Sequence, residues 1–166
     1  MSDAELMGLA LEQAARGLKA GVMPIGAVLT HEGEILAEAH WRGSQAGLLA
    51  HPEHVVLMQA DALIEWRARR ECVLYTTLEP CLLCMGAAMS FFLGRIVYAM
   101  PAPADGAAEV ATAWRPRLGH PTGSGSYSLP GVVGGVCGTE ARALVVGWLD
   151  TGVTGAEADF ARLTLG

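Results

Sequence analysis

His51-Pro52-Glu53 and Pro80-Cys81-Leu82-Leu83-Cys84 are the two stretches of this 166-residue chain that say most about its fold. Two cysteines three residues apart at the start of a helix project from one side of its first turn. There the unpaired amides and the helix dipole favour thiolates. A proline before the first cysteine suits a helix N-terminus, and Pro52 predicts a second helix start beside His51 and Glu53. The two stretches therefore predict two helices whose N-terminal ends meet.

His51, Cys81 and Cys84 together have the composition of a zinc site. Three protein ligands leave one position of tetrahedral zinc open, as in catalytic sites, whereas a structural site has a fourth Cys or His. Zinc lowers the pKa of a bound water from near 16 to about 7, and Glu53 is the carboxylate that could move the released proton. His54, one helical turn after His51, is an alternative ligand. Because the motif needs only His51, we favour His54 as a hydrogen-bonded histidine behind the metal site or in the core. The pattern favours a catalytic metal site.

These residues form the H-x-E…P-C-x-x-C signature of zinc nucleobase deaminases, and the sequence resembles the cytidine deaminase-like superfamily. Residues 24–29 (PIGAVL), 75–87 (YTTLEPCLLCMGA) and 94–98 (GRIVY) are similar to the bacterial tRNA adenosine deaminase and guanine deaminase branch. The resemblance covers residues 5–105 well and the remainder weakly. It implies a three-layer α/β/α sandwich, catalytic Zn²⁺ and hydrolytic release of ammonia. Glu53 would carry protons from water to the ring and then to the leaving nitrogen.

Two positions depart from the pattern of that branch. Pro52 stands where the branch usually has Ala. His40, beside Trp41 and Arg42, falls at or near the position of a substrate-contacting Asn. The resemblance therefore supports the catalytic machinery and leaves the identity of the substrate open.

Candidate substrate contacts come from the front strand, from the segment before the first cysteine and from aromatic residues that could stack on a flat ring. The resemblance implies that the first strand and the backbone of residues 78–79 border the pocket, while a structural role for the Glu79 side chain is equally open. The predicted contacts are Ala27, His40, Leu78, Glu79 and Trp114, with Trp41 and His120 as further candidates for stacking.

The charge of the chain bears on its binding partner, and its cysteine content bears on the state of the thiols. The formal net charge is −6, the pI is about 5.3, and Lys19 is the single lysine. Proteins that grip a nucleic acid backbone normally have a basic stripe or tail, whereas residues 154–166 hold one cation, Arg162. We therefore expect no nucleic-acid partner. Cys72 and Cys137 have no partner at ligand spacing and are expected to be buried reduced thiols.

Alternating helical and strand patterns predict a central mixed sheet of about five strands with helices on both faces. Ser2 and Glu5 form a predicted capping box, and a turn at Glu32-Gly33 joins the first two strands. Expected helices are 2–20, 52–69, 81–93 and 107–113, followed by one that Thr139 caps and one that Thr154 and Glu157 cap; expected strands are 25–30, 35–40, 72–77, 95–99 and 131–136.

We expect residues 1–166 to be a single domain, a zinc-dependent aminohydrolase. Its substrate would be a free nucleobase, nucleoside or related heterocycle such as a triazine, guanine- or cytosine-like ahead of adenine. No apolar run is long enough to span a membrane, so the cytoplasm is the default location. Apolar residues in 85–92, together with the resemblance, suggest a homodimer.

Two other functions stay open at this point. One is tRNA wobble adenosine deamination, which residues 77–81 support and the acidic charge opposes. The other is a zinc-stabilised binding or scaffold protein without activity, in which Pro52 is the lesion. It predicts bound zinc without turnover.

Overall fold

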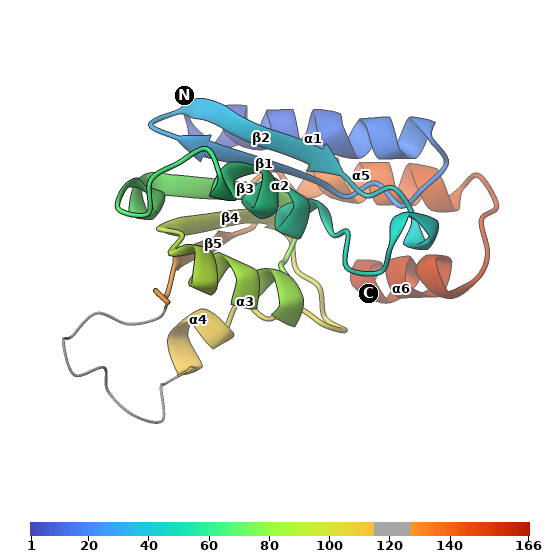
Figure 1. Ribbon diagram of the computed structural model, residues 1–166. Coiled ribbons are helices and arrows are strands. Elements are labelled where there is room, and N and C mark those ends of the chain that lie inside the picture. Colours follow the sequence, from blue (N-terminus) through green and yellow to red (C-terminus); the bar gives the residue numbers. More distant parts are fainter. Residues whose placement is uncertain (115–126) are drawn as a thin grey trace.

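A computed structural model describes residues 1–114 and 127–166 and contains a five-stranded sheet in the order β2-β1-β3-β4-β5 (Figure 1). Strand β1 (Gly26–His31) pairs antiparallel with β2 (Glu34–His40) and with β3 (Cys72–Leu78). Strands β3, β4 (Arg95–Met100) and β5 (Gly131–Gly134) are parallel. The predicted mixed sheet of about five strands is confirmed.

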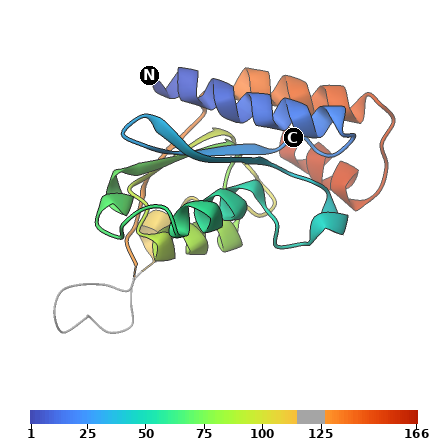
Figure 2. The same cartoon turned by 45° about the horizontal axis from the view of Figure 1, so that its top comes forward.

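Helices cover both faces of the sheet (Figures 1 and 2). Helices α1 (Asp3–Lys19) and α5 (Gly138–Leu149) lie on one face, and α2 (Pro52–Asp61), α3 (Leu82–Phe91) and the short α4 (Val110–Ala113) lie on the other. Each face has its own apolar cluster, which matches the expected three layers.

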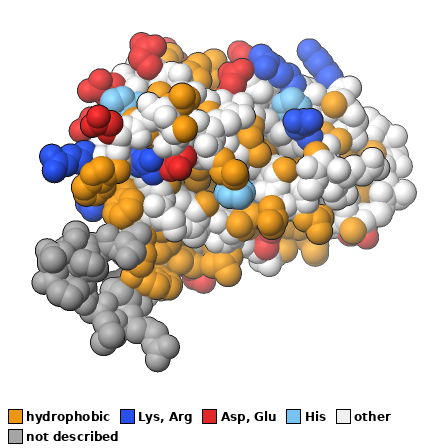
Figure 3. Space-filling model, viewed as in Figure 1, with side chains coloured by type: hydrophobic (Ala, Val, Ile, Leu, Met, Phe, Trp, Pro, Cys, Tyr) orange, Lys and Arg blue, Asp and Glu red, His pale blue; other side chains and the backbone are white. Residues whose placement is uncertain are grey.

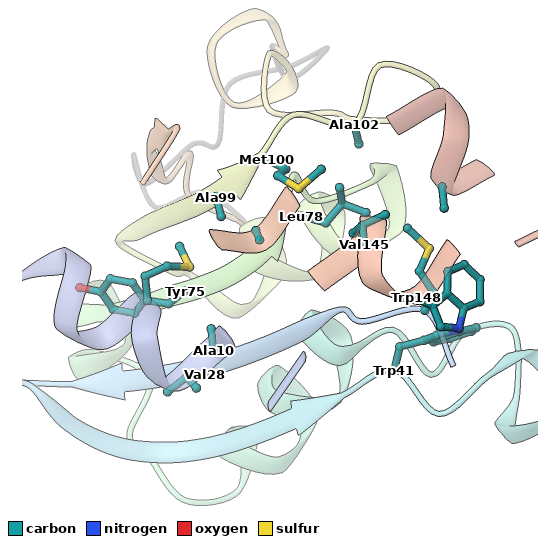
Figure 4. Packing of buried hydrophobic residues seen from close by; sticks show 14 of the residues in the cluster. Ala10, Val28, Trp41, Tyr75, Leu78, Ala99, Met100, Ala102, Val145 and Trp148 are labelled. Carbon is teal, nitrogen blue, oxygen red and sulfur yellow. The ribbon is translucent and has the colours of Figure 1, made fainter. Parts of the chain in front are cut away.

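The last helix, α6 (Ala156–Leu165), contributes Ala158 and Ala161 to the cluster beneath α1 and α5. Trp41 and Trp148 lie at one end of this cluster (Figure 4). The arrangement brings the C-terminal helix to the same end of the molecule as the segment that follows β2. Both clusters pack on one sheet, and the single domain stays a prediction. None of the helices in the described part of the chain is long and apolar enough to cross a membrane.

Helix α2 is shorter than the predicted helix over 52–69, and that prediction is wrong beyond Asp61. Arg69 folds back on the helix end, with Nη2 donating to the Asp61 carbonyl at 2.8 Å and Nη1 lying 2.6 Å from Oδ1 of the same residue. A 3₁₀ turn, η2 (Ala68–Glu71), then leads into β3. The guanidinium thus satisfies a carbonyl at the helix end, where carbonyls have no partner within the helix.

Two of the three predicted N-caps are also wrong. Ser2 caps α1 in a complete capping box, as predicted. Helix α5, however, begins after Cys137 rather than at Thr139, and α6 begins after Gly155, whose φ is 99°. The side chain of Glu157 contacts residues outside its helix instead of closing a box.

The contact between Asp3 and Arg95 makes stability depend on pH. Arg95 donates to both carboxylate oxygens of Asp3, at 2.8 and 2.6 Å, and is the largest cause that lowers the pKa of Asp3 below 3.8. Stabilisation from a lowered carboxyl pKa is present above the unfolded-state pKa and is lost as pH falls through the folded-state pKa. Asp3→Asn should therefore lower the free energy of unfolding at pH 7 by about 1 kcal/mol, since the pair is partly exposed.

Urea titrations measure this loss at pH 7 and at steps below pH 4. The loss should shrink as the solution becomes more acidic. Asp159→Asn is the control, because Asp159 forms an exposed pair with Arg162 within α6 and should change the free energy of unfolding by less than about 0.5 kcal/mol. A loss for Asp3→Asn that is equal at every pH would contradict the role of its charge.

Candidate active site

The three predicted metal ligands meet at the N-terminal ends of α2 and α3. His51 is the N-cap of α2, Cys81 is the N-cap of α3 and Cys84 lies in the first turn of α3. The His51 Nδ1 atom is 3.4 Å from Cys81 Sγ and 3.5 Å from Cys84 Sγ, and the two sulfurs are 3.7 Å apart.

These distances fit a zinc ion. With Zn–S near 2.3 Å and Zn–N near 2.0–2.1 Å, tetrahedral angles require about 3.8 Å between sulfurs and about 3.6 Å between sulfur and nitrogen. Among the described residues, His51, Cys81 and Cys84 form the group of His, Cys, Asp and Glu side chains that could hold a metal. His54 is not in this group, and its Nδ1 lies 2.9 Å from the Leu49 carbonyl oxygen.

The two thiols shift each other's pKa in opposite directions. The contact with Cys84 is the largest cause that lowers the pKa of Cys81 to about 4, and the His51 ring lowers it further. The same contact, together with burial, raises the pKa of Cys84. Because zinc ligation needs both sulfurs deprotonated and a neutral imidazole, zinc binding at these residues would release protons and would weaken as pH falls.

Glu53 lies beside the ligands in a closed environment. It is 4 % exposed, its Oε1 accepts a hydrogen bond from Thr76 Oγ1 at 2.8 Å, and its Oε2 lies 3.6 Å from Cys84 Sγ. Burial raises the pKa of Glu53 above its ordinary value of 4.5, and the bond from Thr76 partly offsets this. A carboxyl group with a raised pKa can both accept and return a proton near neutral pH.

A cavity of about 360 Å³ opens beside these residues, within the range of small-molecule sites. Apolar side chains form most of its walls, among them Met23, Ile25, Leu48, Leu78 and Phe160. No Lys or Arg lines this cavity in the described ranges of the chain. The shape and lining suit a flat, mostly uncharged ring.

Glu79 lines the cavity, but protein donors already occupy its carboxylate. Oε2 accepts from the Ala102 amide at 3.0 Å, and Oε1 accepts from the Ala108 amide at 3.1 Å. These bonds hold the loop that brings Asp105 to the cavity, where burial raises the pKa of Asp105. The structural role left open for Glu79 is therefore the one that its contacts favour.

The other predicted contacts lie in different places. Leu78 lines the cavity, whereas Ala27 has no exposed surface and lies in the cluster with α2 and α3. His40 and Trp114 are not among the residues that line the cavity, and Trp114 packs against Tyr127 with ring centroids 4.4 Å apart. Roles in substrate binding stay predictions for these residues. His120 lies outside the described residues.

Sequence reasoning missed the cavity residues that come from distant segments. Met23 precedes β1, Leu48 lies in the segment before α2, and Glu157 and Phe160 lie on α6. None belongs to a motif, and Glu157 was assigned to a helix cap. Trp41, predicted as a ring-stacking residue, lines the cavity and meets the His51 ring edge-on at 5.7 Å between centroids.

Loss of one sulfur ligand should abolish tight zinc binding. Cys81→Ser leaves two strong ligands, so the zinc retained after dialysis against a chelator should fall from one ion per chain to near zero. Plasma mass spectrometry measures the zinc content. Cys72→Ser is the control, since Cys72 is buried at the start of β3 outside the ligand group and should keep its zinc. Full zinc retention by Cys81→Ser would exclude this site.

The part of the chain that contains His51, Cys81 and Cys84 is similar to known deaminases. The MafB19-like deaminase family matches residues 1–111. The tRNA-specific adenosine deaminase of Bacillus subtilis is 38% identical over 109 residues, which cover 64% of this chain and 67% of that protein. The corresponding protein of Aquifex aeolicus is 29% identical over 99 residues, which cover 59% of this chain and 66% of that protein.

Solved structures give the same result for the fold. A tRNA:A34 deaminase studied for A-to-I editing at the wobble position of transfer RNA superposes with a TM-score of 0.66 at 29% identity, over 84% of this chain and 98% of that one. Guanine deaminase from Bacillus subtilis superposes with a TM-score of 0.54 at 29% identity, over 61% and 66% of the two chains. The expected resemblance is confirmed: the chain belongs to the MafB19-like deaminase family and is a hydrolytic deaminase with a cytidine deaminase-like fold.

Proposed function

We propose that this protein hydrolyses the 6-amino group of adenosine in tRNA, giving inosine and ammonia. The observation that carries the proposal is the 38% identity to a tRNA-specific adenosine deaminase over 109 residues. The named relatives favour this alternative over the free guanine- or cytosine-like ring that the sequence analysis preferred. They also give no support to the expectation that the protein has no nucleic-acid partner.

Selection of guanine over adenine in this cavity would depend on Asp105. Guanine presents donors at N1 and at its 2-amino group, so a site that selects guanine needs free acceptors, whereas the ring nitrogens of adenine only accept. Of the carboxylates that line the cavity, Glu79 and Glu157 each accept two hydrogen bonds from the protein itself. Glu53 and Asp105 are then the carboxylates left to face the ring, and because Glu53 is the proposed proton carrier, Asp105 is the one left to accept from guanine.

Cations beside the cavity could contact RNA phosphates. Arg42 is exposed and follows Trp41, which lines the cavity. Burial, Arg16 and Arg42 lower the pKa of His40 in that order, so the two guanidinium groups act on the same end of β2. On the face in Figure 3, Lys and Arg lie in small separate groups rather than in one band. We therefore expect few phosphate contacts and a shallow salt dependence.

The residues around the metal site divide the chemistry between them. A zinc ion held by His51, Cys81 and Cys84 would supply the Lewis acidity that makes water a nucleophile at neutral pH. Glu53 takes one proton from the attacking water and passes it to the ring nitrogen beside the amine-bearing carbon. It then takes the remaining proton of the added hydroxyl and gives it to the amine, so that the carbonyl forms as ammonia leaves. Thr76 holds Oε1 of Glu53 in place, which leaves Oε2, on the side of Cys84, for proton transfer.

A substrate panel tests the proposal. Zinc-loaded protein is assayed for ammonia release with an anticodon stem-loop RNA that carries adenosine at the wobble position, and with adenosine, adenine, guanine, cytosine and a triazine. Release from the RNA should greatly exceed release from every free compound, and Glu53→Gln should abolish it. Release from free guanine or cytosine without release from the RNA would overturn the proposal.

Arg42 gives a sharper test of RNA binding. Arg42→Ser should raise the KM for the stem-loop roughly three- to tenfold, because one phosphate contact is lost, while kcat stays within twofold. Arg70→Ser removes the same charge beside the first residue of β3, at the strand end opposite Leu78 and the cavity, and should leave KM unchanged. Equal effects of the two substitutions would contradict a contact at Arg42.

Deamination of a free heterocycle is the second candidate function. Its support is the acidic character of the chain, with net charge −6, and a cavity whose described lining holds carboxylates and no Lys or Arg. It predicts turnover of a small ring at a rate independent of salt.

The scaffold hypothesis predicts zinc without turnover of any panel member. It required Pro52 to disturb the site, but Pro52 occupies the first position of α2, where proline is favoured, and Glu53 lies beside the ligands. These two features support an active site.

The proposed homodimer stays a prediction. Met58 on α2 and Leu82 on α3 are 64% and 68% exposed, and this apolar surface supports pairing through those helices.

Thr76→Val tests the role of Glu53 as the group that moves protons. A hydrogen bond donated to a carboxylate favours its charged form, so its removal raises the pKa of Glu53. The acidic limb of the profile of kcat/KM against pH should move upward by roughly one unit. Thr30→Val is the control, since Thr30 is also buried in the sheet but donates to the Val73 carbonyl. An unmoved acidic limb in Thr76→Val would contradict Glu53 as the base.

A further inference from the structure

Helix α6 forms one wall of the catalytic cavity, although it lies beyond the residues 1–111 that match the family. Ala156, Glu157 and Phe160 all line the cavity. Glu157 stands in the first turn of the helix and is partly buried. The wall therefore comes from a part of the chain that the metal motifs do not predict.

The Glu157 carboxylate joins this helix to the opposite wall. Oε2 accepts from the Trp41 indole Nε1 at 3.4 Å, and Oε1 accepts from the Ser44 backbone amide at 3.2 Å. Trp41 follows β2, and Ser44 begins a 3₁₀ turn, η1 (Ser44–Ala46). One side chain thus holds both ends of the segment 41–44, which leads on to Leu48 in the cavity wall.

Trp41 continues the connection to the metal site. Its indole is 9% exposed and meets the His51 ring edge-on, with centroids 5.7 Å apart and an interplanar angle of 81°. An aromatic neighbour in this orientation limits rotation of the imidazole. Trp41 therefore contacts both the Glu157 carboxylate and the His51 ring.

The local sequence of α6 would have allowed a different use of Glu157. Thr154 and Glu157 have the spacing of a capping box, yet the N-cap is Gly155 and no side chain caps this helix end. The carboxylate is directed instead to residues more than a hundred positions earlier in the chain. The position of the Glu157 side chain is therefore set by its contacts with Trp41 and Ser44 and not by the helix on which it lies.

We propose that Glu157 is a positioning residue, which ties α6 to the segment 41–44 and through Trp41 fixes the orientation of the His51 ring. The proposal rests on deaminase activity but not on which ring or RNA is the substrate. It predicts that a residue outside the ligand set controls both metal affinity and turnover.

Zinc affinity and steady-state kinetics of Glu157→Ala test the proposal. Removal of a residue that orients a metal ligand typically weakens metal affinity by 10- to 100-fold, so we expect a loss of roughly tenfold in a chelator competition assay. A misplaced ligand should also lower kcat by about tenfold or more, with a smaller change in KM. Glu157→Gln keeps one acceptor oxygen and should recover part of both losses.

Asp159→Asn is the matched control, because it removes one negative charge from the same turn of α6 at a residue that does not line the cavity. Its zinc affinity and kcat should equal those of the unmodified protein. Equal losses for Asp159→Asn and Glu157→Gln would show a general effect of helix charge and would overturn the proposal.

A double-mutant cycle with Trp41→Phe tests the route through the indole. Phenylalanine keeps a ring against His51 but has no Nε1–H for Glu157. If Glu157 acts through Trp41, the double variant Trp41→Phe with Glu157→Ala loses no more zinc affinity than Glu157→Ala alone. Losses that multiply would overturn the proposed route.

The zinc measurements also separate the two proposals. If no RNA is deaminated but the zinc affinities follow the expected order, the proposed substrate fails and the positioning role stands. If the RNA is deaminated but Glu157→Ala binds zinc as tightly as the unmodified protein, the positioning role fails alone.

Discussion

The structure depends on the meeting of two helix N-terminal ends, those of α2 and α3, around three ligand atoms that lie within 4.8 Å of one another. His51 and Cys81 are both N-caps with extended backbones, and neither side chain caps its own helix, so each is free to turn toward the other. Strand β3 ends at Leu78 and the chain enters α3 almost at once, which places Cys81 at the carboxyl end of the sheet. Ligand sites of open α/β sheets commonly lie at that edge.

The helix starts, the first helix cap and the first hairpin turn could be predicted from short sequence signals. Pro52 and Pro80 predicted both helix starts, and Ser2 with Glu5 predicted the first cap, because these signals act within one turn of helix. The distances between the ligand atoms and the residues of the cavity wall could not be predicted in this way. The turn at Glu32 and Gly33 was predicted for the same reason, and both residues adopt the positive φ angles that a tight hairpin needs.

Predictions failed where a distant residue competes with a local one. Arg69 ends α2 early by folding back on Asp61, and the contacts of Glu157 with Trp41 and Ser44 replace a capping box. Ala27 and His40 do not line the cavity, and their roles in substrate binding stay predictions. The net charge leaves the partner open, because an overall value of −6 does not describe the few cations beside the cavity.

The origin of the α6 wall bears on how such enzymes diverge. The residues proposed to hold zinc and to move protons lie between His51 and Cys84, whereas Phe160 and Glu157 belong to a segment outside the family match. Changes in this C-terminal segment could alter which rings enter while the hydrolytic residues stay under separate selection. A lineage could therefore acquire a new substrate by replacing its last helix, and a name transferred from the first two thirds of the chain would not record the change.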